Sequence, residues 1–166
     1  MWMDRKMKKT NQNSVLVDLG LLMMRIMIGV VFLFHGSQKL FGAFEGSGMD
    51  GFAAFLGQME VPYPTLSAYL AGLAEFVGGL MVLTGVGLRL AVVPMIFTML
   101  VASFMVHGDS FSLQKGGMEY SLTLAVILAG MGLTGAGRFS ACALFSHKAE
   151  RAAESFEQTN LSRVET

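Results

Sequence analysis

The sequence predicts an all-α polytopic membrane protein, a four-helix transmembrane bundle with a short interfacial helix in the first outer loop. Of the 166 residues, 53% are hydrophobic and 14% are charged, against roughly 25% charged residues in soluble domains. A membrane-spanning helix needs about 20 apolar residues, because each residue adds ~1.5 Å toward the ~30 Å hydrocarbon core. Four apolar stretches approach this length, at about residues 18–41, 66–84, 88–107 and 118–135.

Composition also limits the kinds of function. The formal net charge is +0, so no bulk electrostatic attraction to nucleic acid is expected. The single cysteine, Cys142, excludes an internal disulfide and a CxxC redox pair. Redox chemistry would therefore need a bound cofactor or a partner protein.

The first span follows a polar N-terminal segment, residues 1–17. The apolar run is too long for the core of a signal peptide, and no small-residue cleavage site closes it, so an uncleaved helix is predicted. This span carries Arg25, His35 and Lys39. Charged groups in lipid are costly, so these side chains need partners inside the bundle.

The loop at residues 42–65 carries apolar residues with the period of one helix face. They are Phe52, Phe55, Leu56 and Met59. Asp50 precedes them and Pro62 follows, as expected at the two ends of a helix. We expect a short helix that lies on the membrane surface. The alternative is a loop with incidental apolar residues.

Each of the other three stretches carries an ionisable residue. Glu75 lies near the middle of the second span among three glycines, which let neighbouring backbones approach closely. The third span ends at His107, and the fourth begins at Glu119.

The distribution of Lys and Arg predicts the orientation. Most of them precede the first span, lie between the second and third spans, or follow the fourth. Cytoplasmic loops carry the excess of Lys and Arg, so both termini are expected in the cytoplasm. Residues 139–166 would then form a cytoplasmic C-terminal tail.

Antiparallel spans would bring the ionisable side chains to shared depths. His35, Lys39, His107 and Glu119 would meet near the outer boundary, with Glu75 below them. We predict that these five residues line a ligand-binding pocket. Within it, His35, Glu75 and Glu119 are the candidate catalytic residues, because each can exchange a proton.

Helical geometry places the three charged residues of the first span on one side. At ~100° per residue, Lys39 lies ~40° and His35 ~80° from Arg25 around the helix. Structural interpretations remain open for all of them. Arg25 and Glu75 could form a purely structural ion pair, His35 could be a hydrogen-bonded core histidine, and Lys39 could extend to the interface.

No nucleophile–base pair, Walker loop, dinucleotide-binding glycine motif or zinc-ligand spacing is present in the sequence. His35 and His107 could in principle ligate one haem between the first and third spans. The nearby Lys39 and the position of His107 close to the surface disfavour that arrangement. No metal site is predicted.

Several motifs resemble those of the DoxX family. Arg25 is followed by FLFHGSQKLFG, and later come AGLAEFVGGLMVLTGVGLRLA and GLTGAGRFS. The similarity covers about residues 19–140, and the HG..K element of His35, Gly36 and Lys39 carries much of its weight. A second element, E..GG..L..G, begins at Glu75.

The resemblance implies a four-helix bacterial inner-membrane protein. Members are often named as oxidoreductases. Some are associated with quinone-linked thiosulfate oxidation, and others with responses to quinones, catechols or thiol and oxidative stress. Many members have an Asp soon after the closing motif, but this chain has Ala141 and Cys142 there, so that position is not transferred.

Three hypotheses for function follow. In a quinone-linked redox subunit, His35 or Lys39 would bind a quinone oxygen, Glu119 and His107 would exchange protons with the outer side, and Glu75 would relay them. Electrons would come from a soluble partner protein. The alternative is a non-catalytic membrane anchor or assembly factor for a redox or stress-response complex. A small-solute carrier is disfavoured, because the chain has no internal repeat, although a homo-oligomer could restore the symmetry.

Overall fold

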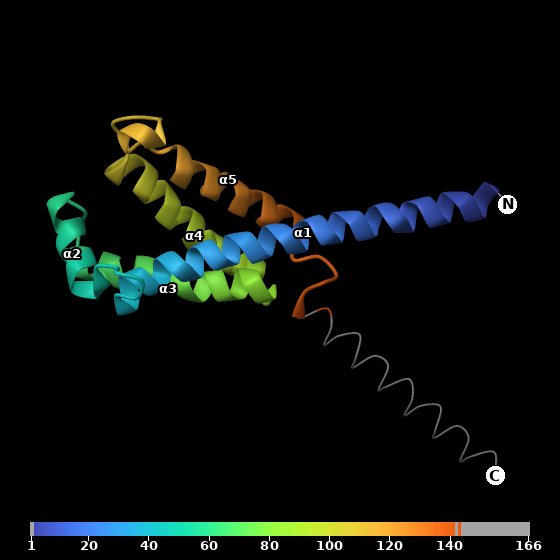
Figure 1. Ribbon diagram of the computed structural model, residues 1–166, viewed down its shortest axis with the longest axis horizontal. Helices are drawn as coiled ribbons and strands as arrows, with labels where there is room; N and C mark the ends of the chain where they lie inside the picture. The colour runs from blue at the N-terminus through green and yellow to red at the C-terminus, as the bar shows by residue number, and fades with distance from the viewer. Residues whose placement is uncertain (1, 142, 144–166) are drawn as a thin grey trace, which may run out of the picture.

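The computed structural model describes residues 2–141 and 143, which are helical apart from turns and loops (Figure 1). The long helices are α1 (Trp2–Phe41), α3 (Pro64–Thr84), α4 (Leu88–Val101) and α5 (Glu119–Thr134). The described residues also form three shorter elements: α2 (Gly48–Gln58), the π-helical turn η1 (Ala102–Val106) and the 3₁₀ turn η2 (Leu113–Lys115). The predicted all-α fold is confirmed.

Among the residues that the structure describes, three segments are long and apolar enough to cross a membrane: Val15–Phe41 of α1, all of α3, and Leu88–Val106, which is α4 together with η1. The fourth predicted span is the apolar helix α5, which is shorter, with 16 residues. At ~1.5 Å per residue it extends about 24 Å. The fold is therefore that of a helical membrane protein in which α5 is shorter than the three candidate spans.

Helix α1 also includes residues 2–17, which were predicted as a separate N-terminal segment. Only their polarity distinguishes them from the apolar span. No Gly or Pro interrupts these residues, and Gly and Pro are the strongest helix breakers. The predicted helix in the first loop is also present, as α2. Leu56 of α2 is buried against Val61, which precedes α3, and against Ala68 in the first turns of α3, so α2 packs on the bundle. Of the predicted tail, residues 139–166, the structure describes only 139–141 and 143.

Close packing of α1 along α3 depends on glycines. A Cβ atom at Gly36 would lie 2.6 Å from the backbone N of Phe76, and one at Gly79 would lie 2.9 Å from the backbone N of Leu33. Both distances are shorter than a carbon atom tolerates, so only glycine allows the two backbones to come this close. Gly36 is therefore level with Phe76, which fixes the antiparallel register of α1 and α3.

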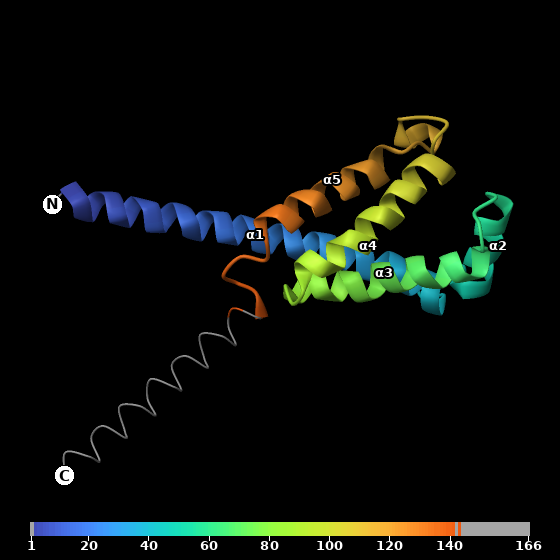
Figure 2. The same ribbon diagram turned by 180° about the vertical axis from the view of Figure 1, so that it is seen from behind.

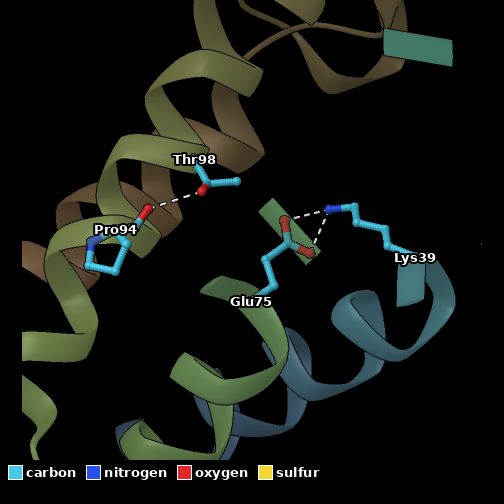
Figure 3. Close-up of polar contacts among 4 residues, drawn as sticks. All are labelled: Lys39, Glu75, Pro94 and Thr98. Atoms are coloured by element: carbon cyan, nitrogen blue, oxygen red, sulfur yellow. Dashed lines mark hydrogen bonds and ion pairs between the residues drawn. The ribbon is translucent and has the colours of Figure 1, made fainter. Parts of the chain in front are cut away.

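The helices pack in the order α1, α3, α4 and α5, and α4 and α5 diverge from α1 and α3 toward the end that carries α2 (Figures 1 and 2). Two features of α4 favour bending. Pro94 lies inside the helix, and the Thr98 hydroxyl donates to the Pro94 carbonyl oxygen at 3.0 Å (Figure 3). The apolar core fills the part where all four helices meet, and Phe32, Val82, Met95, Leu128 and Met131 are among its most buried side chains.

Candidate functional site

A partly open cavity of about 190 Å³ lies between the diverging helices. All four long helices contribute to it, and η1 does as well. Its polar lining residues are His35, Lys39, Glu75, His107, Tyr120 and Ser121. Its apolar lining residues are Val31, Phe32, Met99, Ala102 and Leu124. Four of the five predicted pocket residues are thus brought together.

The centre of the polar group is an ion pair between α1 and α3. The Lys39 ammonium contacts both carboxylate oxygens of Glu75 (Figure 3). Glu75 has no exposed surface, whereas the Lys39 side chain is 24% exposed. The same ammonium lies 5.0 Å from the ring centroid of Phe52 on α2, within the range of a cation–π interaction.

The predicted ion pair between Arg25 and Glu75 is wrong. The register of α1 against α3 places Arg25 level with Val82, seven residues or about 10 Å along α3 from Glu75. Lys39 lies at the level of Glu75 and forms the ion pair with its carboxylate. The depths expected from the sequence bring Glu75 too close to Arg25, because residue spacing within each helix does not determine how far the two helices are shifted along each other.

Arg25 instead binds backbone carbonyl groups, and only 1% of its surface is exposed. Its guanidinium donates to the carbonyl oxygens of Val82, Leu83, Ala136 and Phe139, at 3.0, 2.9, 2.8 and 3.3 Å. Val82 and Leu83 belong to the last turn of α3, and Ala136 follows the end of α5. Carbonyl groups at helix C-termini lack intrahelical partners and carry partial negative charge. Arg25 therefore joins three segments at the end of the bundle opposite the cavity.

His35 lies at the rim of the cavity, between two aromatic rings. Its ring meets Tyr120 of α5 edge-on, with centroids 6.4 Å apart, and Phe34 at 5.5 Å. Tyr120 is not among the residues predicted from the sequence, although its phenol can donate and accept hydrogen bonds. Tyr120 follows Glu119 at the start of the fourth predicted span, which was expected to begin level with His35. This position in the sequence could have identified Tyr120 as a site residue.

His107 and Glu119 interact with the loop between α4 and α5. The Nδ1 atom of His107 lies 2.8 Å from the Gly116 carbonyl oxygen, and the ring still lines the cavity. The Glu119 carboxylate accepts a hydrogen bond from the backbone N–H of Leu113 at 2.9 Å. Glu119 is not among the residues that line the cavity, so the structure does not bring it to the other four.

A buried hydroxyl pair supports the wall formed by η1 and α5. The Oγ atoms of Ser103 and Ser121 lie 2.7 Å apart, and the Ser103 hydroxyl also lies 2.8 Å from the Met99 carbonyl oxygen. Ser103 belongs to the π-helical turn, a geometry that is frequent at functional sites. This pair fixes the position of Ser121 next to Tyr120.

The chain belongs to the DoxX family, whose sequence pattern it matches over residues 20–108. Among curated proteins it is 28% identical, over 134 residues, to the "Putative oxidoreductase CatD" of Bacillus subtilis (strain 168). That alignment covers 81% of this chain and 92% of the relative. No solved structure gives a significant match. The membrane-protein class and the predicted family are thus confirmed.

Proposed function

We propose that this protein is a quinone-linked redox subunit of a bacterial inner membrane, and that the cavity binds the quinone headgroup. The observation that carries the proposal is the cavity itself, which combines His35, Tyr120 and the Lys39–Glu75 pair with an apolar lining between the long helices. The name of the Bacillus subtilis relative supports the redox class.

The cavity fits a quinone headgroup in size and in chemistry. An engineered protein cavity of about 150 Å³ binds benzene, so the 190 Å³ available here is enough for one substituted ring. Phe32 and Leu124 offer apolar surface to the faces of such a ring. His35 and Tyr120 offer hydrogen-bond donors to its oxygen atoms.

A bound quinone supplies two-electron, two-proton redox chemistry. His35 and Tyr120 would hold the two oxygen atoms, and the imidazole of His35 would also take part in proton transfer. Glu75 keeps Lys39 in place, and the two charges cancel, so the headgroup meets a polar surface of low net charge. His107 lines the cavity and also contacts the carbonyl oxygen of the exposed Gly116, and it would exchange protons with water. Electrons would come from a soluble partner protein.

The test is the quinone content of the purified protein. Wild-type protein extracted in mild detergent should co-purify with quinone, and His35→Ala should lose most of it. Glu119→Gln is the matched control, because this carboxylate lies outside the cavity lining. Absence of quinone from the wild-type protein, even after incubation with added quinone, would overturn the proposal.

One observation favours a second candidate, a non-catalytic membrane anchor or assembly factor. Within the described part of the chain, every buried polar side-chain atom has a hydrogen-bond partner. A polar cluster that is already satisfied can serve to lock four helices together. In that case His35→Ala would leave the cellular role of the protein intact while the protein still folds.

A further inference from the structure

The lining of the cavity divides into a buried floor and an exposed rim. The buried residues are Phe32, Glu75, Met99, Ser121 and Leu124. The partly or fully exposed residues are Val31, His35, Lys39, Ala102, His107 and Tyr120. Tyr120 is 43% exposed although it lies in an apolar helix. The rim therefore includes facing residues of α1 and α5.

The pairing of α1 with the α5 segment is tight at the opposite end and loose at the cavity. At the tight end, Arg25 donates to the Ala136 carbonyl oxygen at 2.8 Å, and the backbone N–H of Arg138 donates to Asp18 at 3.1 Å. At the cavity, the two helices meet through the edge-on contact of His35 with Tyr120. Both views show α5 diverging from α1 toward this end (Figures 1 and 2).

We call the contact region of α1 and α5 beside His35 and Tyr120 the seam, and exposed side chains flank it on both helices. Val31 is its rim residue on α1, and the neighbouring Val30 and Met27 are exposed to 49% and 62%. On α5, Thr123 lies three residues beyond Tyr120 and is exposed. A cavity of 190 Å³ holds one ring, so a long hydrocarbon chain attached to that ring must leave the cavity. The seam offers a route that keeps the chain in an apolar environment.

We infer that the site takes a lipid-tailed quinone, whose ring occupies the cavity and whose hydrocarbon tail leaves between α1 and α5, past Val31 and Thr123, into the bilayer. This inference rests on the proposed function. It adds that the ligand resides in the membrane and enters between α1 and α5. A water-soluble quinone that enters past the loop between α4 and α5 would then not be the natural ligand.

Fluorescence quenching tests the path of the tail. The chain has one Trp, so Trp2→Phe gives a background into which Thr123→Trp is introduced as the reporter. Ala129→Trp is the matched control, because Ala129 is also exposed on α5 but lies about 240° further around the helix. The probes, in nanodiscs, are a tailless dimethoxy-methyl-benzoquinone, its decyl-tailed form, and the decyl form with bromine atoms on the tail.

We expect saturable quenching of the Thr123→Trp reporter by the decyl probe, and a further saturable loss of fluorescence with the brominated tail. The Ala129→Trp control should show only the small, non-saturable quenching by bromine that is expected of any Trp facing the lipid. Equal bromine quenching at both positions, together with saturable binding, would show that the tail does not pass between α1 and α5. The proposed headgroup site would not be affected by that result. Binding of the tailless probe alone would also overturn the inference, because the ligand would then come from water. If no probe bound saturably, the proposed function itself would fail, and the inference with it.

Discussion

The Lys39 ammonium on α1 contacts both carboxylate oxygens of Glu75 on α3, yet the two partners differ in burial. Glu75 is completely buried, and the Lys39 side chain is 24% exposed. The long aliphatic stem of Lys39 allows its charge to reach water or the interface. The shorter side chain of Glu75 keeps its carboxylate buried. Removal of either partner should therefore have unequal consequences.

Lys39→Met should destabilise the protein strongly, because it leaves the Glu75 carboxylate buried without a counter-ion. Breaking a buried pair in this way costs about 3–5 kcal/mol. Glu75→Gln should cost less, since the free Lys39 can turn outward. The double variant Lys39→Met/Glu75→Leu should recover most of the loss, because no buried charge remains. Thermal unfolding in detergent measures all three, and equal losses in the two single variants would contradict the asymmetry.

Arg25→Gln should destabilise the bundle by about 3 kcal/mol or more, because hydrogen bonds to a charged donor each contribute roughly 1.5–3 kcal/mol. Four backbone carbonyl groups accept from this guanidinium. Arg138→Gln is the control. Its ion pair with Asp18 has an N–O distance of 3.9 Å and the Arg138 side chain is 51% exposed, so its loss should cost no more than about 1 kcal/mol. Thermal unfolding that ranks the two variants equally would show that Arg25 does not hold the helix ends together.

Gly36→Ala should separate α1 from α3, since its Cβ would lie 2.6 Å from the backbone N of Phe76. The Lys39–Glu75 pair is formed by the same two helices, so quinone binding should fall together with thermal stability. Gly130→Ala has nothing within 4 Å of the new Cβ and should be neutral, or stabilising by up to about 1 kcal/mol from helix propensity. A Gly36→Ala variant as stable as Gly130→Ala would mean that the helices are not in close contact there.

The sequence was sufficient to predict the helices and most of the residues in the polar cluster. Apolar runs and the spacing of Phe52, Phe55, Leu56 and Met59 report burial and periodicity, which are local properties. Lys39 and Glu75 were expected in one pocket because ionisable groups in lipid must face inward. The structure brings both to the cavity.

The remaining details depend on interactions that residue types do not encode. The partners of Arg25 are carbonyl groups, which every residue has, so the sequence favoured the nearest carboxylate instead. Glu119 turns to the Leu113 backbone, because the loop before α5 folds over it. Tyr120 went unnoticed, because a neutral phenol gives no charge signal. Each of these depends on the register of helices and loops in three dimensions.

The topology can be tested with reporter fusions, and the result also decides whether the short helix α5 crosses the membrane. The Lys and Arg distribution predicts both termini in the cytoplasm, which requires α5, with its 16 residues, to cross. A green fluorescent protein fused after Thr166 should therefore fluoresce, and alkaline phosphatase fused there should be inactive. Fusions after Lys115, in the loop before α5, should give the opposite pattern and serve as the internal control. Active phosphatase at both positions would mean that α5 does not cross, since about 24 Å of helix falls short of the ~30 Å core unless the bilayer thins around it.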